Sequence, residues 1–390
     1  MKRLRITLIA LLTILALSTA TFAEDKFRFA VFSDTRGNLI TKSCLDDNAG
    51  VSSIFPLVRD HVIKINETKP IQLVLFPGDM VTGSFPRDAG STSECNRVQL
   101  SKWREVMKPL LDKGIQVRVT VGNHEVGTFD PSKEDVSCGK HDRPYLPSYQ
   151  NFQVFKDILG DMLAEDNGPK SNFGLTYSFD VDGCHFAIIS AYTMYENNSF
   201  SNETMQWLDN DLKTAHDKGY KLFVASHPPA FPGGGHTWDS LPFFDPTYTC
   251  SDYSGIDRRK ERDRFWNMLK KHGVIAYFCG HEHNTQIQLV DGCWQATIGG
   301  LTSKLYKLNG AEGDTQRNLI LYDGHFQNPK AVVNWPWDEN NEMSHWGWAL
   351  VTVDNERVTM DIYGTEKLPE SVDDFKKLKT FTLREAVRKY

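Results

Sequence analysis

Residues 115–125 read IQVRVTVGNHE, a short run rich in β-branched residues that ends in a polar sequence. Such a run favours a β-strand, which would deliver Asn123 and His124 to the end of that strand. In an open α/β sheet, ligands bind in the loops beyond the carboxyl ends of the strands, because helices cover both faces. We therefore expect Asn123 and His124 to lie at a ligand-binding edge of a sheet.

Four other stretches have the same form, an apolar run followed by a polar residue. Their polar residues are Asp34, Asp79, His227 and the pair His281 and His283, which follow residues 27–32, 71–76, 222–226 and 274–280. Five predicted strand ends thus carry Asp, Asp, Asn, His and His-x-His.

Segments with helical periodicity alternate with the predicted strands, which indicates an α/β fold. These segments are residues 52–68, 97–113, 149–165, 203–218 and 257–272. Asp-Gly pairs at 182–183 and 291–292 lie between alternating runs and predict two β-hairpins. We interpret the hairpins as a sign of two sheet halves built alike, packed as a sandwich with helices outside.

The C-terminal part predicts two more strands, residues 348–353 and 358–363, and then a charged tail with helical spacing. The segment that leads into these strands, residues 322–348, is rich in Trp and His. This density predicts either a wall that stacks on a substrate or edge strands and loops that pack on the sheet.

The first 23 residues have the features of a signal peptide: a charged start, an apolar core at 6–17 and a small-residue cleavage site at 21–23. The alternative, a membrane anchor, needs about 20 apolar residues, and Thr and Ser residues cut this run short. No later stretch is apolar and long enough to span a bilayer. We expect a periplasmic or secreted protein with one domain, residues 24–390, and loop insertions near 126–147, 228–256 and 322–348.

Charge and cysteine content narrow the class of protein further. The formal net charge of -6 and the lack of a long Lys/Arg run argue against a protein that coats nucleic acids. Seven cysteines in an exported chain predict up to three disulfides, with Cys44 and Cys95 as one pair and Cys279 unpaired. The alternative is that several cysteines are free and buried.

Five sequence motifs and their order along the chain resemble those of the calcineurin-like metallophosphoesterase superfamily, with features of its purple acid phosphatase branch. The motifs are Asp34, Gly78-Asp79, Gly122-Asn123-His124-Glu125, Ser226-His227 and Gly280-His281-Glu282-His283. The resemblance implies a four-layer α/β/β/α sandwich. It also implies an enzyme that hydrolyses phosphate esters through a hydroxide bridging two divalent or trivalent metal ions (Mn, Fe, Zn or Co).

The resemblance also implies a role for each matching residue. Asp79 would bridge the two ions, and His124 would act near the phosphate as an acid or charge stabiliser. The remaining ligands would be Asn123, His227 and His281 for one ion, and Asp34 and His283 for the other.

The first motif departs from the family pattern. Most relatives have Asp-x-His where this chain has Asp34-Thr35-Arg36, and the purple acid phosphatase branch adds a tyrosine where this chain has Thr82. We hypothesise that Arg36 clamps substrate phosphate or pairs with an acid near the site. The alternative is a weak first metal site. His236, beside a glycine run, is a further candidate for substrate contact.

These observations predict a small phosphate ester as substrate, with monoesters preferred. One alternative is a phosphodiesterase acting on nucleotides or lipid head groups. The other is a metal-binding surface protein that Arg36 has made catalytically silent.

Overall fold

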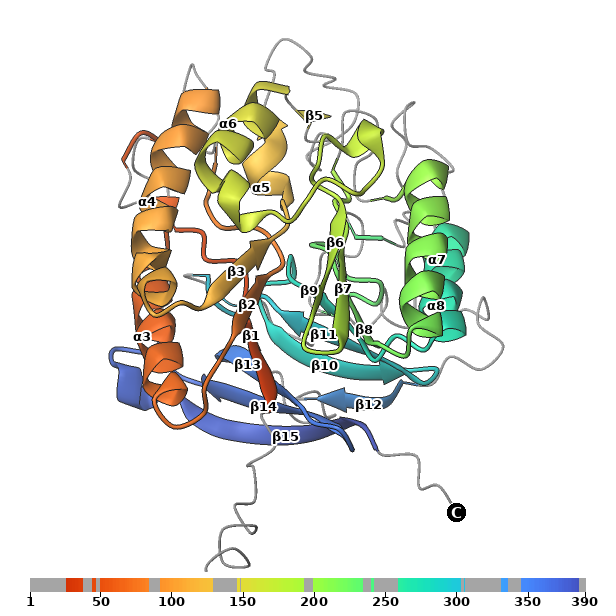
Figure 1. Ribbon diagram of the computed structural model, residues 1–390. Coiled ribbons are helices and arrows are strands. Elements are labelled where there is room, and N and C mark those ends of the chain that lie inside the picture. The colour runs from red at the N-terminus through yellow and green to blue at the C-terminus, as the bar shows by residue number, and fades with distance from the viewer. Residues whose placement is uncertain are drawn as a thin grey trace, which may run out of the picture.

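Two β-sheets face each other, and helices cover the outer side of each sheet (Figure 1). The structure is a computed structural model. It describes residues 26–37, 44–46, 50–83, 92–128, 146–147, 149–192, 199–233, 240–241, 259–302, 305, 331–335 and 345–385. The expected signal peptide at 1–23 lies outside these residues.

The first sheet has six strands in the order β15-β14-β13-β1-β2-β3. They are β1 (Phe27–Val31), β2 (Leu73–Phe76), β3 (Gln116–Val119), β13 (Trp346–Val353), β14 (Val358–Thr365) and β15 (Lys376–Arg384). β1, β2 and β3 are parallel, and β13 pairs antiparallel with β1. The register brings Phe27 beside Val353, Val353 beside Val358, and Val358 beside Arg384. The start of β1 and the end of β15 therefore lie at the same end of the sheet.

The second sheet has seven strands in the order β12-β10-β11-β9-β8-β7-β6. They are β6 (Tyr177–Val181), β7 (Cys184–Ile188), β8 (Lys221–Ala225), β9 (Ala276–Cys279), β10 (Thr285–Val290), β11 (Cys293–Ile298) and β12 (Ala331–Trp335). Its central strands β7, β8, β9 and β11 are parallel. A small third sheet joins β4 (Gly127–Thr128) to β5 (Leu146–Pro147).

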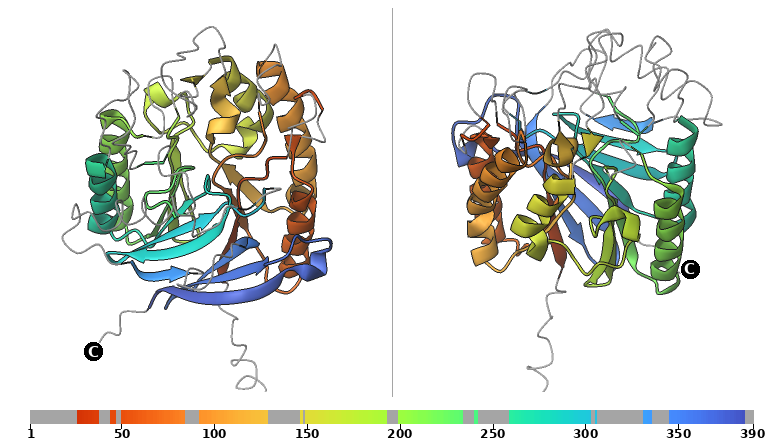
Figure 2. Two further views of the ribbon diagram at one scale, coloured as in Figure 1. Left: turned by 180° about the vertical axis from the view of Figure 1, so that it is seen from behind. Right: turned by 90° about the horizontal axis from the view of Figure 1, so that it is seen from above.

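Helices form the two outer layers. α3 (Ile54–Asn66) and α4 (Thr92–Asp112) cover the first sheet, and α7 (Asn202–Asp217) and α8 (Arg259–His272) cover the second (Figure 2). The other helical elements in the described ranges are α5 (Asn123–Val126), α6 (Tyr149–Leu159), η3 (Gly160–Met162), η4 (Lys170–Asn172) and η5 (Val372–Asp374). The expected four-layer α/β/β/α sandwich is confirmed.

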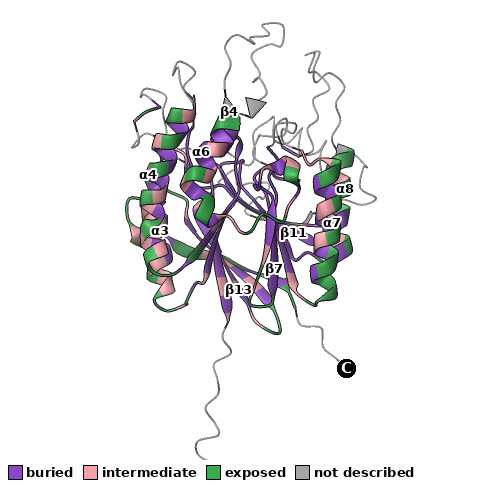
Figure 3. Cartoon of the chain, turned by 45° about the horizontal axis from the view of Figure 1, so that its top comes forward, coloured by how far each residue is buried: buried purple, intermediate pink, exposed green. Residues whose placement is uncertain are grey.

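The inner faces of the two sheets share one aromatic core. The ring of Phe29 in β1 lies 5.1 Å from Phe186, 5.2 Å from Phe223 and 5.7 Å from Phe278, which belong to β7, β8 and β9. Burial of such rings supplies much of the hydrophobic free energy of folding. The helices bury one face against the sheets and expose the other (Figure 3), as their apolar spacing predicted.

Both predicted hairpins form, β6 with β7 and β10 with β11. The interpretation of two sheet halves built alike is wrong, because both hairpins belong to the second sheet. A hairpin signal is local and states which strands pair, but not which sheet the pair joins. The C-terminal strands β13, β14 and β15 complete the first sheet instead.

The charged tail, for which the sequence predicted helical spacing, contains a strand instead. This strand is β15, at the edge of the first sheet. Phe381 and Leu383 alternate toward the core, while the three lysines of β15 are exposed. Its partner β14 supplies the backbone hydrogen bonds, a long-range contact that residue spacing does not reveal. Lysines on an exposed edge strand oppose pairing with other chains.

The aromatic segment 322–348 is explained by packing where the structure describes it. Trp335 in β12 stacks on His345, and Trp348 in β13 stacks on Tyr363 of β14. These residues are part of the sheets and their edges, which favours the packing alternative. Trp337 and most of the other two insertions lie outside the described residues.

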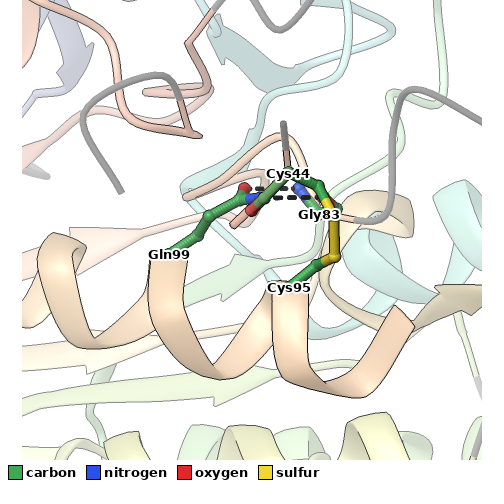
Figure 4. Close-up of a disulfide and its surroundings, with 4 residues drawn as sticks. All are labelled: Cys44, Gly83, Cys95 and Gln99. Atoms are coloured by element: carbon green, nitrogen blue, oxygen red, sulfur yellow. Dashed lines mark hydrogen bonds between the residues drawn. A yellow bond between two sulfur atoms is a disulfide. The ribbon is translucent and has the colours of Figure 1, made fainter. Parts of the chain in front are cut away.

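The predicted Cys44–Cys95 disulfide is present and joins the loop after β1 to α4 (Figure 4). Gln99 reinforces it: its amide group donates to the carbonyl oxygens of Cys44 (2.6 Å) and Gly83 (2.9 Å) and accepts from Gly83 N (2.9 Å). The expectation of up to three disulfides is wrong, because Cys184, Cys279 and Cys293 are free and buried. Cys279 is unpaired as predicted.

We expect the double replacement Cys44→Ala and Cys95→Ala to lower the free energy of unfolding by about 2–4 kcal/mol. The bond spans 51 residues, and its loss gives the unfolded chain more conformational freedom. Urea denaturation of both proteins measures the effect. A reductant should lower the midpoint of the native protein and leave the double variant unchanged; equal midpoints without reductant would contradict the prediction.

Among the described residues, no helix has the length and apolar character needed to cross a membrane.

Candidate metal centre

The five predicted strand ends converge on one place, where the carboxyl ends of the central strands of both sheets meet. Backbone hydrogen bonds join the loops there: Asp34 N donates to Gly78 O (3.2 Å), and Gly280 N donates to His227 O (3.0 Å). Another bond, from Ser33 N to Ile298 O (3.0 Å), connects the first sheet to the second. The site therefore depends on the packing of both sheets.

Four of the predicted site residues have left-handed backbone conformations. The φ angles are 59° at Asp34, 54° at Asp79, 71° at His281 and 30° at His283. Non-glycine residues rarely adopt such angles, and local strain of this kind is concentrated at functional sites.

Two glycines are required by close approach to the site carboxylates. A Cβ atom on Gly122 would lie 2.1 Å from Asp79 Oδ1, and one on Gly280 would lie 2.2 Å from Asp34 Oδ2. Any larger residue at either position would displace a carboxylate.

Two groups of buried side chains are compatible with metal binding. In the first, Asp79, His227 and His281 place possible ligand atoms within 4.8 Å of one another, and in the second Asp34, Asp79 and His283 do the same. Asp79 belongs to both groups, which is the arrangement expected of a bridging carboxylate.

Hydrogen bonding orients His227 for the first group. His227 Nδ1 lies 2.7 Å from Pro77 O and donates its proton there, so Nε2 is the nitrogen that carries the lone pair when the ring is neutral. That Nε2 atom lies 3.3 Å from Asp79 Oδ1 and 3.2 Å from His281 Nδ1. Burial acts to lower the pKa of His227, but the charge of Asp79 and its hydrogen bond to the ring raise that pKa to about 9. Without a cation the ring therefore keeps a proton on Nε2, and a metal ion would displace that proton on binding.

Asn123 begins α5 at the end of the third predicted strand, and its side-chain oxygen Oδ1 is buried. Within the part of the chain that the structure describes, Oδ1 has no hydrogen-bond partner. A buried acceptor without a donor is costly, and a cation next to the first group would satisfy it.

Asp34 has several donors of its own. Ser33 Oγ donates to Asp34 Oδ2 (2.6 Å), and His281 N lies 3.1 Å from Oδ1 and 3.0 Å from Oδ2. Burial, together with the nearby charge of Asp79, raises the pKa of Asp34 to about 7.

Glu125, which the sequence motif contains but to which we gave no role, holds the turn around Asp79. Its Oε1 accepts from Met80 N (2.7 Å) and Val81 N (3.2 Å), and its Oε2 accepts from Asp79 N (2.9 Å) and Gly122 N (2.7 Å). Burial and Asp79 raise the pKa of Glu125 to about 8, against the opposite effect of these backbone donors. The acidic residue directly after Asn123-His124 was the sequence signal that could have indicated this role.

Arg36 lies against two of the site histidines. Its Nη1 contacts His124 Nε2, and its Nη2 contacts His283 Nε2 and lies 3.3 Å from His283 Nδ1. His124 Nδ1 donates to Thr82 O (2.7 Å), which leaves Nε2 as the acceptor for the guanidinium. Burial and the charge of Arg36 lower the pKa of His124 to about 3, so its imidazole is neutral.

Thr82 holds the Arg36 segment in place. Its hydroxyl donates to Gly37 O (2.9 Å), and the backbone of Arg36 pairs with Val51 in an isolated β-bridge. His236 lies outside the described residues.

A model of the calcineurin-like phosphoesterase family matches residues 27–285, a span that includes all five motifs. The chain belongs to this family. Curated relatives are the Arabidopsis thaliana purple acid phosphatase 23, 28% identical over 249 residues (60% of this chain and 44% of that protein), and purple acid phosphatase 21, 27% identical over 166 residues (42% and 29%). The chain thus matches less than half the length of these two relatives.

The fold comparison agrees with this family assignment. A purple acid phosphatase from yellow lupin (Lupinus luteus) seeds aligns with 92% of this chain and 53% of its own, with a TM-score of 0.55 and 12% identity. This chain and the lupin protein therefore share a fold.

Proposed function

We propose that this phosphoesterase hydrolyses small phosphate esters at a metal-dependent centre, with phosphomonoesters preferred. The observation that carries the proposal is the buried group of Asp79, His227 and His281, in which the bond to Pro77 O leaves Nε2 of His227 facing Asp79 as the nitrogen that can bind a metal. A fixed lone pair beside a buried carboxylate is how protein sites orient a metal ligand.

Asp79, Asn123, His227 and His281 fit one ion. They offer a carboxylate, an amide oxygen that lacks a donor among the described residues, and two imidazoles. Such donors suit Mn, Fe, Zn and Co alike. An ion held there would polarise a phosphoryl oxygen and make water acidic enough to attack phosphorus near neutral pH.

Arg36 is proposed to bind the substrate phosphate, because a guanidinium is permanently charged and presents two parallel donors. His124, kept neutral, would hold the guanidinium in position through Nε2. His236 stays a proposed substrate contact. The second group, with Asp34 and His283, does not fit an ion while Arg36 contacts His283 Nε2.

The preference for monoesters is supported by the purple acid phosphatase relatives. We further propose that the protein is exported, with residues 1–23 as its signal peptide. The Cys44–Cys95 disulfide supports this location, because disulfides persist in oxidising compartments.

The test is hydrolysis of a chromogenic phosphomonoester beside the matching diester by metal-stripped protein supplied with Mn, Zn, Fe or Co. We expect turnover to depend on metal, to be faster with the monoester, and to be lost in His227→Ala. The matched control is His216→Ala, an exposed histidine of α7, which should keep the wild-type rate.

Faster turnover of the diester would favour the phosphodiesterase alternative. No turnover with any metal, in protein that binds the ion tightly, would overturn the proposed activity and favour a metal-binding surface protein.

A further inference from the structure

The second metal-compatible group, Asp34, Asp79 and His283, has a cation of its own beside it. The guanidinium of Arg36 contacts His283 Nε2 through Nη2, and the same Nε2 atom lies 3.9 Å from Asp34 Oδ1. The ring nitrogen of His283 that faces Asp34 is therefore the one that accepts the hydrogen bond from Arg36.

A hydrogen bond from Arg36 and a bond to a metal exclude each other at this atom. A guanidinium keeps all its protons in proteins, so each contact it makes with a ring nitrogen uses that nitrogen as acceptor. An imidazole nitrogen has one lone pair, and metal coordination would need the same lone pair. While Arg36 is in place, His283 Nε2 is not a ligand.

Asp34 accepts hydrogen bonds from two donors within the protein, which hold its carboxylate in place. Its carboxylate accepts from Ser33 Oγ at 2.6 Å and from His281 N at 3.1 and 3.0 Å. Without His283 Nε2, the group retains two carboxylates, one of which the first ion shares.

The segment that carries Arg36 is fixed on both sides. Its backbone pairs with Val51, Gly37 N donates to Gly50 O (3.1 Å), and Ser52 N donates to Thr35 O (2.6 Å). Thr35 Oγ1 also accepts from Trp103 Nε1 (3.0 Å) in the core. The guanidinium is thus held by the same packing that holds the site.

We propose that Arg36 replaces the second metal ion, so that the centre holds one ion, at Asp79, Asn123, His227 and His281. The inference rests on the proposed metal-dependent function of that group. Electrostatics are consistent with it, because the positive charge of Arg36 acts on both Asp34 and Asp79, as a second cation would.

The test is the number of Mn²⁺ ions bound per chain, measured by elemental analysis of metal-stripped protein reloaded with excess Mn²⁺ and desalted. We expect about one ion for the native protein and about two for Arg36→His, which removes the guanidinium and adds a ligand. The matched control Arg357→His, at an exposed arginine, should bind about one. Electron paramagnetic resonance should show an isolated ion in the native protein and a magnetically coupled pair in Arg36→His.

Two outcomes overturn the proposal. One is a native protein that binds two ions with a coupled signal. The other is an Arg36→His variant, folded by its melting curve, that still binds one. Hydrolysis is measured separately from the number of bound ions. One bound ion without turnover would support the single-ion inference and contradict the proposed function. Turnover with two bound ions would support the proposed function and contradict the single-ion inference.

Discussion

Replacing Asp79 with asparagine is expected to slow metal-dependent ester hydrolysis by roughly a thousandfold or more, about 4 kcal/mol of transition-state stabilisation. Asp79 belongs to both metal-compatible groups, and its negative charge acts on the buried His227. Asparagine keeps the size of the side chain and removes the charge that would attract a cation. Metal content should fall with activity, and both are measured on the same preparation.

Asp217→Asn is the matched control for this replacement. Asp217 is exposed at the end of α7 and pairs with Lys213 (2.5 Å). An exposed pair of this kind adds little to stability and should not affect turnover. A folded Asp79→Asn protein with the wild-type rate would place the hydrolysis elsewhere in the molecule.

Replacing Glu125 with glutamine is expected to lower the free energy of unfolding by about 3–5 kcal/mol. Each carboxylate oxygen accepts two backbone N–H groups, as described for Asp79, Met80, Val81 and Gly122. A glutamine can offer one oxygen, so its NH₂ group must face two donors in either orientation. Urea denaturation gives the change, and a looser turn at Asp79 should also weaken metal binding about 10–100-fold.

The control is Glu105→Gln on the exposed side of α4, where Glu105 pairs with Lys102. We expect that variant to stay within about 0.5 kcal/mol of the native protein. An equally small change in the free energy of unfolding for Glu125→Gln would contradict the prediction. It would mean that Glu125 is protonated in the folded protein, the form that burial favours by raising its pKa.

The strands that carry the site were predictable from the sequence because each combines an apolar run with a polar end. β1, β2, β3, β8 and β9 follow this pattern, and their carboxyl ends meet as the rule for α/β sheets requires. The amphipathic helices were equally clear. Local signals of this kind do not depend on the rest of the chain.

The assignment of strands to sheets was not predictable in this way. The hairpin β10–β11 joins β9 through a parallel pair, and β15 depends on β14 for its hydrogen bonds. Both choices depend on contacts with other strands. The lysines at the start of β15 hid the apolar alternation at its end, so the residue pattern gave no sign of that strand. Two of the free cysteines were also missed, because they sit in strands of one sheet as ordinary apolar residues.

In the site, sequence reasoning found the residues but not their mutual contacts. The motif order indicated Asp34, Asp79, Asn123, His227, His281 and His283, and the structure brings these residues together. The place of the Arg36 guanidinium, between His124 and His283, required three-dimensional packing. So did the role of Glu125, whose four donors come from two separate turns.

The register of the first sheet has a practical consequence for handling the molecule. Lys26, just before β1, and Glu385, just after β15, lie at the same end of that sheet, while Asp34 follows the opposite end of β1. A tether attached beside either residue would hold the protein by the end of the first sheet that lies opposite the metal-ligand loops. Immobilised on a chip or resin in this orientation, the protein would keep its metal-ligand loops turned away from the support.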